Sequence, residues 1–337
     1  MADNQCRLLT SPDMIQHRKD PRSYLEIEEQ LKNVLRTSVL IPCGHVQGGC
    51  VSEAWKFHTD EGRVFVKCNY RDQALIMFNG EMASLEAIRK TCTVRVPQPV
   101  TLTELPAGGA VLILECMDLK PIGKFAEKLG DQLANLHVHN RLMQIEMLKN
   151  SGTIGEHNRK DYLRTVDKFG FHTTTCCGYI PQENEWQEDW VTFFTSQRLQ
   201  PQVRLIERDY GDRTLLGLWS ELQVKIQNAF RDTSIFPSLL HGDLWEANVA
   251  EDDHGPVLFD PGSFYGHSEY DLSIGDMFGG HCVDFYEAYH RKIPKSPGFE
   301  LRQPLYQLFH SLNNWNHFGA VFRRSTLNLM RYLLQIL

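Results

Sequence analysis

The chain has 337 residues, of which 42% are hydrophobic and 23% charged, and its formal net charge is −7. This length and apolar content are sufficient for two packed lobes with separate cores. No apolar stretch approaches the length of a membrane helix, and no basic patch stands out along the chain. We therefore expect neither nucleic acid nor a membrane among the partners of this protein.

Nine cysteines are scattered along the chain without zinc-binding spacing. Such scatter favours reduced thiols in a cytoplasmic protein over a disulfide framework. The first twenty residues mix acids and bases and contain no apolar segment, which argues against a secretory signal. Residues 1–24 are expected to form a flexible N-terminal extension, to which we assign no role.

The first helix is predicted at residues 24–37, and a glycine-rich segment follows at residues 44–50. Gly48 and Gly49 permit close approach of the backbone to a phosphate, although the segment does not spell the G-x-G-x-x-G of protein kinases. Cys50 ends this loop, where exposure and backbone N–H groups favour a reactive thiol. Its oxidation is expected to block the loop or to link two otherwise monomeric chains, unless Cys50 only fills apolar space under the strand.

A lysine and a glutamate come next in the pattern. The β-branched and aromatic run at residues 63–67 predicts a strand that ends in Lys67. Residues 73–90 carry apolar side chains at helical spacing, and Glu81 lies beside that stripe. A strand lysine paired with a helical glutamate holds the phosphates of ATP in kinases. Glu86 is the competing partner, but it is expected to face solvent.

An apolar strand is predicted at residues 110–114, and it ends in Glu115, Cys116 and Met117. In a kinase fold, backbone groups at this point bind the adenine base, so these three residues are the predicted hinge. Beyond the hinge, four apolar residues at helical spacing predict the first helix of a second lobe: Phe125, Leu129, Leu133 and Leu136.

The segment from His241 to Val249 carries the chemistry. Asp243 is followed five residues later by Asn248, and the short apolar strand at residues 257–259 leads into Asp260. This is the spacing of a kinase catalytic loop, in which the first aspartate accepts the proton of a substrate hydroxyl. Asn248 and Asp260 then supply oxygen ligands for Mg²⁺. Each residue alone is better explained as a turn residue, but the three in this order are not.

Three further residues are placed around this loop. Asp271 is expected to brace the catalytic loop by accepting backbone hydrogen bonds. Trp245, within the loop, and Trp315, near the C-terminus, are candidates to contact a sugar. The alternative for both tryptophans is a place in the core, which is the more common environment of this residue type.

Longer strings extend the pattern beyond a kinase loop. They include GGCVSEAW at 48–55, KFGFHTTTCCGYIPQENEWQEDW at 168–190, LLHGDLWEANVAEDDHGPV at 239–257 and FDPGSFYGHSEYDLSI at 259–274. By these strings the chain resembles the fructosamine-3-kinase and ketosamine-3-kinase family from about Leu25 onward. The resemblance implies an α+β, bilobal protein-kinase-like fold of the aminoglycoside-phosphotransferase type. Its N-lobe, at 25–117, is a small antiparallel sheet, and its C-lobe, at 118–337, is mostly helical.

The resemblance also implies an activity. It is ATP-dependent phosphorylation of the 3-hydroxyl of a ketosamine on lysine, after which the adduct decomposes and the amine is freed. The substrates implied are glycated proteins or lysine ketosamines, with ATP and Mg²⁺ as cofactors. Asp243 matches the catalytic base, Lys67 and Glu81 the phosphate pair, and Asn248 and Asp260 the metal ligands. The motifs alone leave open a kinase of free aminoglycoside-like or choline-like molecules, and a nucleotide-binding pseudokinase. The preferred sugar is not determined by the sequence.

Overall fold

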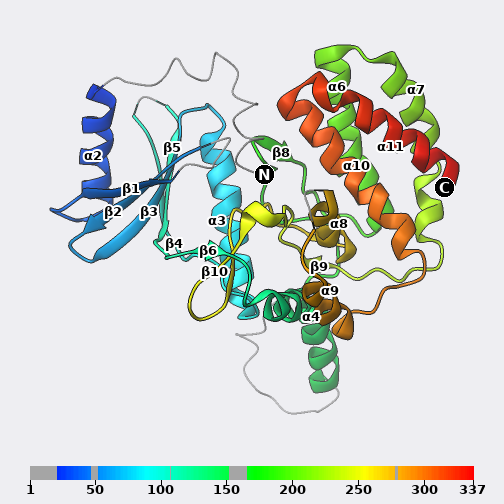
Figure 1. Ribbon diagram of the computed structural model, residues 1–337, viewed down its shortest axis with the longest axis horizontal. Helices are drawn as coiled ribbons and strands as arrows, with labels where there is room; N and C mark the ends of the chain where they lie inside the picture. The colour runs from blue at the N-terminus through cyan, green and yellow to red at the C-terminus, as the bar shows by residue number, and fades with distance from the viewer. Residues whose placement is uncertain (1–20, 47–51, 107, 152–164, 278–279) are drawn as a thin grey trace.

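The computed structural model describes residues 21–46, 52–106, 108–151, 165–277 and 280–337, and Figure 1 shows a sheet-containing part beside a larger helical part. The sheet is antiparallel, in the order β1-β2-β3-β5-β4. Its strands are β1 (Ile41–Val46), β2 (Glu53–Thr59), β3 (Gly62–Asn69), β4 (Pro99–Glu104) and β5 (Ala110–Glu115). The predicted strands at 63–67 and 110–114 are thereby confirmed, with β5 beside β3 at the centre of the sheet.

Two helices cover the two faces of this sheet. Helix α2 (Pro21–Leu35) packs on one face through Leu31, and helix α3 (Ala74–Thr91) packs on the other through Phe78. Because strand side chains alternate between faces, Val111 and Ile113 of β5 join the α2 side, while Leu112 joins the α3 side. The same alternation directs Lys67 towards α3, because its neighbour Val66 belongs to the α2 side.

The larger part is helical and is built around α10 (Phe299–Phe318), which packs against α6 (Gln200–Tyr210), α8 (Glu269–Met277) and α11 (Arg323–Ile336). Helix α4 (Ala126–Ser151) packs against α9 (Val283–Lys292). Three of the four residues in the predicted stripe are confirmed in α4, where Leu129, Leu133 and Leu136 are fully buried, whereas Phe125 precedes the helix and is half-buried. The remaining helical segments are α5 (Trp190–Phe194), a π-helical turn (Thr195–Leu199), α7 (Arg213–Leu222) and 3₁₀ turns at Ile226–Phe230, Glu246–Asn248 and Ala320–Phe322.

Short strands hold the loops that carry the predicted catalytic residues. β10 (Val249–Glu251) lies between β11 (Pro256–Leu258) and β6 (Lys120–Pro121), so Asn248 precedes one strand of a hairpin and Asp260 follows the other. β9 (Ser238–Leu239) pairs with β12 (Tyr265–Gly266), and β7 (Thr175–Cys177) with β8 (Ile180–Gln182). Within the described residues, no helix combines the length and the apolar character that a bilayer crossing requires.

Candidate active site

Lys67 joins the two parts of the molecule. Its Nζ lies 2.7 Å from Oε2 of Glu81 on α3 and 3.0 Å from Oδ1 of Asp260, which follows β11. The contact between Lys67 and Glu81 is the one expected from the sequence, and the competitor Glu86 is exposed. Burial disfavours the ammonium, but the carboxylates of Asp260 and Glu81 outweigh it, so the pKa of Lys67 is raised above its usual value. Lys67 therefore stays positively charged and is available to phosphates.

Asp243 lies at the centre of the catalytic loop. The amide Nδ2 of Asn248 donates to Oδ2 of Asp243 at 3.0 Å and to its backbone oxygen at 2.9 Å. Burial raises the pKa of Asp243 to about 7; the Asn248 bond opposes this shift, and the nearby charges of Asp260 and Asp271 add to it. A carboxylate with a pKa near 7 is well suited to accept a proton from a hydroxyl at neutral pH.

Asp271, at the start of α8, braces this loop as predicted. Its two carboxylate oxygens accept hydrogen bonds from the backbone N–H of His241 at 2.7 Å and of Gly242 at 2.8 Å. Nε2 of His137, on α4, lies 3.1 Å from the same carboxylate. Burial alone would raise the pKa of Asp271, but these partners outweigh burial and lower it. The brace therefore remains ionised where Asp243 takes up a proton.

His241 connects the catalytic loop to the strand that leads into Asp260. The backbone N–H of Asp243 donates to Nδ1 of His241 at 3.3 Å, and Nε2 lies 3.0 Å from the carbonyl oxygen of Phe259. Burial lowers the pKa of His241, so the ring is neutral and carries its proton on Nε2, which donates to Phe259. One imidazole thus fixes the separation of the two loops.

Two glycines allow the loops to touch. Gly242 has φ of +87°, and a Cβ there would lie 2.2 Å from the carbonyl oxygen of Gly262. A Cβ at Gly262 would lie 2.5 Å from the carbonyl oxygen of Cys176 in β7. The loop of Asp243, the loop of Asp260 and β7 are therefore stacked without room for side chains between their backbones.

The side-chain oxygens of Asn248 and Asp260 are suitable ligands for Mg²⁺. Because Asn248 donates its amide N–H to Asp243, its carbonyl oxygen is left for a cation, and the Asp260 side chain is 46% exposed. The backbone N–H of Phe259 donates to the backbone carbonyl oxygen of Asn248 at 3.2 Å, which keeps the two loops adjacent. Both side chains offer oxygen, the ligand that hard divalent cations prefer.

The predicted hinge lies at the end of β5. The backbone N–H of Glu115 donates to the backbone oxygen of Gln98 at 2.8 Å, and the Glu115 carboxylate pairs with Arg95 at 3.2 Å. Cys116 and Met117 continue the chain toward β6, and the Met117 side chain is buried. The assignment of these backbone groups to adenine remains a prediction.

The two tryptophans behave differently. Trp315 on α10 is fully buried among core residues, so its prediction as a sugar contact is wrong. Because α10 packs against several other helices, the ring of Trp315 is more stable in the core between them than at the solvent-exposed surface. Trp245, within the catalytic loop, is half-buried against the core and remains a candidate. Gly48, Gly49 and Cys50 lie outside the described residues.

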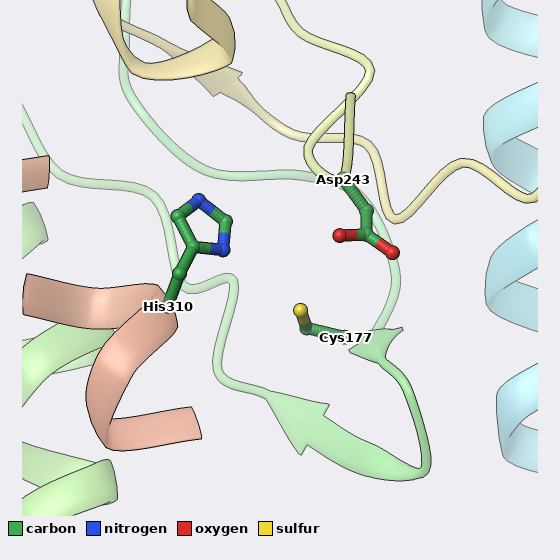
Figure 2. A group of neighbouring side chains, drawn as sticks. All are labelled: Cys177, Asp243 and His310. Carbon is green, nitrogen blue, oxygen red and sulfur yellow. The ribbon is translucent and has the colours of Figure 1, made fainter. Parts of the chain in front are cut away.

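Two residues near Asp243 were not predicted from the sequence. Cys177, at the end of β7, and His310, on α10, have ligand atoms that lie within 4.8 Å of each other and of a carboxylate oxygen of Asp243 (Figure 2). The only signal for Cys177 was its place in the long string at 168–190. His310 lies among apolar residues in a helical pattern, which gives no indication of its neighbours.

The two-part architecture and the paired loops are those of protein-kinase-like phosphotransferases. Solved structures agree: the chain matches a protein described as a candidate fructosamine-3-kinase from Haemophilus somnus with a TM-score of 0.74 and 22% identity, covering 92% of this chain and 97% of that one. The aminoglycoside phosphotransferase APH(4)-Ia matches with a TM-score of 0.53 and 16% identity, covering 93% and 98%. The predicted fold class is confirmed.

Sequence comparisons define the family. The model for "Fructosamine kinase" matches residues 24–336. The chain is 53% identical over 307 residues to the Mus musculus protein named ketosamine-3-kinase, covering 91% of this chain and 99% of the relative. It is 34% identical over 312 residues to the Arabidopsis thaliana chloroplastic protein-ribulosamine 3-kinase, covering 92% and 88%. The chain belongs to the fructosamine kinase family, which confirms the resemblance drawn from the sequence.

Proposed function

We propose that this protein is an ATP-dependent kinase that phosphorylates the 3-hydroxyl of ketosamines on the lysines of glycated proteins. The observation that carries the proposal is Asp243, braced by Asp271 and oriented by Asn248, in a chain 53% identical to a protein named ketosamine-3-kinase. The phosphorylated adduct decomposes, and the lysine amine is released. The protein thereby reverses glycation of other proteins.

The residues have separate roles in this reaction. Asp243 accepts the proton of the acceptor hydroxyl as the oxygen attacks the γ-phosphorus of ATP. Lys67, held by Glu81, contacts the α and β phosphates, and the backbone at Glu115, Cys116 and Met117 binds adenine. Asn248 and Asp260 hold Mg²⁺, which supplies positive charge to the phosphate oxygens when bound. The assignment of Gly48 and Gly49 to the phosphates comes from the sequence, because both residues lie outside the described part of the chain. Trp245 lies against the sugar.

The alternatives have weaker support. The likeness to APH(4)-Ia concerns the fold, because the identity is 16%, and it gives no reason to expect a free aminoglycoside as acceptor. A pseudokinase would be expected to lack at least one of Lys67, Asp243 and Asp260, but all three are present and arranged around one site.

The test is phosphate transfer from ATP to defined acceptors. Lysine ketosamines carrying ribulose, psicose and fructose are compared with free aminoglycosides and choline, with and without Mg²⁺. We expect Mg²⁺-dependent phosphorylation of at least one ketosamine and none of the free molecules. Turnover of an aminoglycoside or choline at a higher kcat/KM than every ketosamine would contradict the proposal, as would the absence of any ATP turnover.

We further propose that the protein is a cytoplasmic monomer whose activity is lowered by oxidation of Cys50. The seven cysteines in the described part of the chain are free thiols, which suits a reducing compartment. Activity and mobility on a non-reducing gel after peroxide, for the wild type and Cys50→Ala, test the role of Cys50. Equal and reversible inactivation of both proteins would assign the effect to another cysteine.

A further inference from the structure

A thiol, an imidazole and a carboxylate meet beside the catalytic loop. Cys177 ends β7, His310 belongs to α10, and Asp243 lies in the loop after β9, so three separate elements bring them together. One ligand atom from each lies within 4.8 Å of the other two. Figure 2 shows the sulfur, the carboxylate and one ring nitrogen of His310 directed into a common space. The side chains of Cys177 and His310 are 3% and 2% exposed.

This donor set differs from the pair assigned to Mg²⁺. Sulfur and imidazole nitrogen are ligands of Zn²⁺ and similar borderline cations, whereas Mg²⁺ prefers oxygen alone. With Zn–S near 2.3 Å and Zn–N or Zn–O near 2.0 Å, tetrahedral ligand atoms lie about 3.3–3.6 Å apart. The three atoms therefore need to converge by at most about 1.5 Å, which side-chain rotation can supply. Water then completes the four-coordinate site.

Neighbouring groups orient two of the three ligands. Nδ2 of Asn313, one helical turn beyond His310, donates a hydrogen bond to Sγ of Cys177 at 3.2 Å. Asn313 is itself positioned by Gln202, whose Nε2 donates to its Oδ1 at 3.3 Å. Burial and the nearby charge of Asp243 raise the pKa of the Cys177 thiol, so the thiolate that binds metal would form only as the cation displaces the proton, and the N–H bond from Asn313 would help to stabilise it. Asn248 similarly holds Oδ2 of Asp243, which leaves the other carboxylate oxygen for a ligand.

His310 is buried in the core beside Cys177 and Asp243. Its Nε2 is buried and has no hydrogen-bond partner within the described residues. Around its ring lie Tyr270 and Phe309, with centroids 5.3 and 5.1 Å away. A buried imidazole without full hydrogen bonding is costly unless something else satisfies it. In Figure 2 the ring nitrogen that faces Cys177 and Asp243 is Nδ1, so a cation among the three would bind that atom, whereas Nε2 is turned away from the site.

We propose that Cys177, His310 and Asp243 form an inhibitory binding site for Zn²⁺, separate from the Mg²⁺ ligands Asn248 and Asp260. The inhibitory effect rests on the proposed function, in which Asp243 is the catalytic base. On binding, the S–H bond of Cys177 is replaced by a Zn–S bond, and its proton passes to solvent. His310 contributes a nitrogen lone pair, and the ionised Asp243 contributes an oxygen. While Zn²⁺ is bound, Asp243 cannot accept the proton of the acceptor hydroxyl.

The position of the site determines the kinetic pattern. Zn²⁺ occupies the place of the acceptor hydroxyl next to Asp243, so it should compete with the ketosamine. It should not compete with ATP, whose phosphates are held by Lys67 on the other side of the site. Excess Mg²⁺ should not relieve the inhibition, because a hard cation binds poorly to sulfur and imidazole.

Binding is tested directly, without reference to activity, by titrating the metal-free full chain with Co²⁺ as a spectroscopic substitute for Zn²⁺. A sulfur-to-cobalt charge-transfer band and tetrahedral visible bands are expected for the wild type, and Zn²⁺ should abolish both. Cys177→Ser and His310→Gln should weaken Co²⁺ and Zn²⁺ binding at least tenfold, the lower limit for disturbing a metal site. Cys176→Ser is the matched control, because Cys176 points to the opposite face of β7 and should bind metal like the wild type.

Zn²⁺ inhibition is then measured for each protein relative to its own zinc-free rate, with a chelator to restore activity. Inhibition should be competitive with the ketosamine and at least tenfold weaker in Cys177→Ser and His310→Gln. No cobalt–sulfur band in the wild type, an unchanged band in Cys177→Ser, or equal inhibition of all variants would overturn the inference. If the band behaves as expected but no ketosamine is phosphorylated by the wild type, the proposed function fails while the metal site stands.

Discussion

Asp243 is a carboxylate placed where ionisation is unfavourable, since burial raises its pKa to about 7. Such a group contributes to stability while protonated, and that contribution is lost as pH rises through its folded-state pKa. An isosteric amide avoids this loss. Catalytic value and folding stability therefore conflict at this one side chain.

Asp243→Asn should lower kcat by roughly 10²–10⁴-fold, the usual contribution of a positioned general base. The KM for ATP should change little, because the carboxylate faces the hydroxyl. The variant should also gain thermal stability relative to the wild type between pH 5 and pH 8. Asp253→Asn is the matched control, since the Asp253 side chain is 90% exposed. Near-normal kcat in Asp243→Asn would remove Asp243 from the mechanism.

The pH dependence of kcat/KM follows from the same pKa. A base must be ionised, so the rate should fall as pH decreases through about 7, tenfold per pH unit at the acid end. Asp271 should not produce this limb, because its pKa is lowered. The measurement is kcat/KM for the ketosamine from pH 5 to pH 9 at saturating Mg²⁺ and ATP. A profile that is flat down to pH 5 would contradict the assignment.

The residues differed in how far the sequence could locate them. Lys67, Glu81, Asn248 and Asp260 were identified because each occupies a fixed offset from a strand or helix whose pattern is readable. Trp315 was wrongly predicted as a sugar contact because a tryptophan that lines a site and a tryptophan buried in the core beside it have the same local sequence pattern. The approach of Cys177 to His310 depends on how β7 packs on α10, 133 positions later, and no local spacing encodes that contact.

At the scale of elements, helix α8 determines where the catalytic loop lies. Its first turn carries Asp271, whose carboxylate accepts hydrogen bonds from the backbone N–H groups of His241 and Gly242 in the loop. Helix α4 contributes His137 to the same group. The loop is therefore fixed by helices that belong to the core of the large lobe, although its own residues form little regular structure.

Asp271→Ala should have two effects: it should destabilise the protein, and it should displace Asp243 from its catalytic position. Two buried N–H groups would lose their acceptor, at about 1–3 kcal/mol each. We expect a lower free energy of unfolding in urea and a reduced kcat, with a KM for ATP close to that of the wild type. Asp284→Ala, at an exposed position on α9, serves as control. Full kcat in a destabilised Asp271→Ala protein would show that the brace does not position Asp243.

On the scale of the whole molecule, the sheet part and the helical part meet through charged contacts. Lys67 pairs with Asp260, and Arg95, which also holds the hinge residue Glu115, pairs with Asp252 after β10. A nucleotide bound between the two parts would add its phosphates and metal to these contacts. The bilobal arrangement was predictable, because both lobes have readable motifs, whereas the pairing of Arg95 with Asp252 was not.

Mg²⁺–ATP should therefore stabilise the native state. At 100 times its Kd the ligand contributes about 2.7 kcal/mol, seen as a higher Tm. Lys67→Met should lose most of this shift, while Lys90→Met, at the exposed end of α3, should retain it. Thermal unfolding with and without Mg²⁺–ATP provides the measurement. An equal shift in Lys67→Met and the wild type would place the phosphates elsewhere.

Asp260 has a backbone φ of +57°, in the left-handed region that few residues other than glycine, asparagine and aspartate tolerate. Backbone geometry and metal binding therefore restrict the residue types tolerated at position 260 independently. In a library of all substitutions at position 260, variants with aspartate, asparagine or glycine should fold, and variants with valine or isoleucine should fold poorly. Only the variant with aspartate should turn over substrate. Glutamate keeps the negative charge but does not tolerate the left-handed backbone conformation well. The choice of aspartate over glutamate at this position therefore depends on the main chain as much as on the cation.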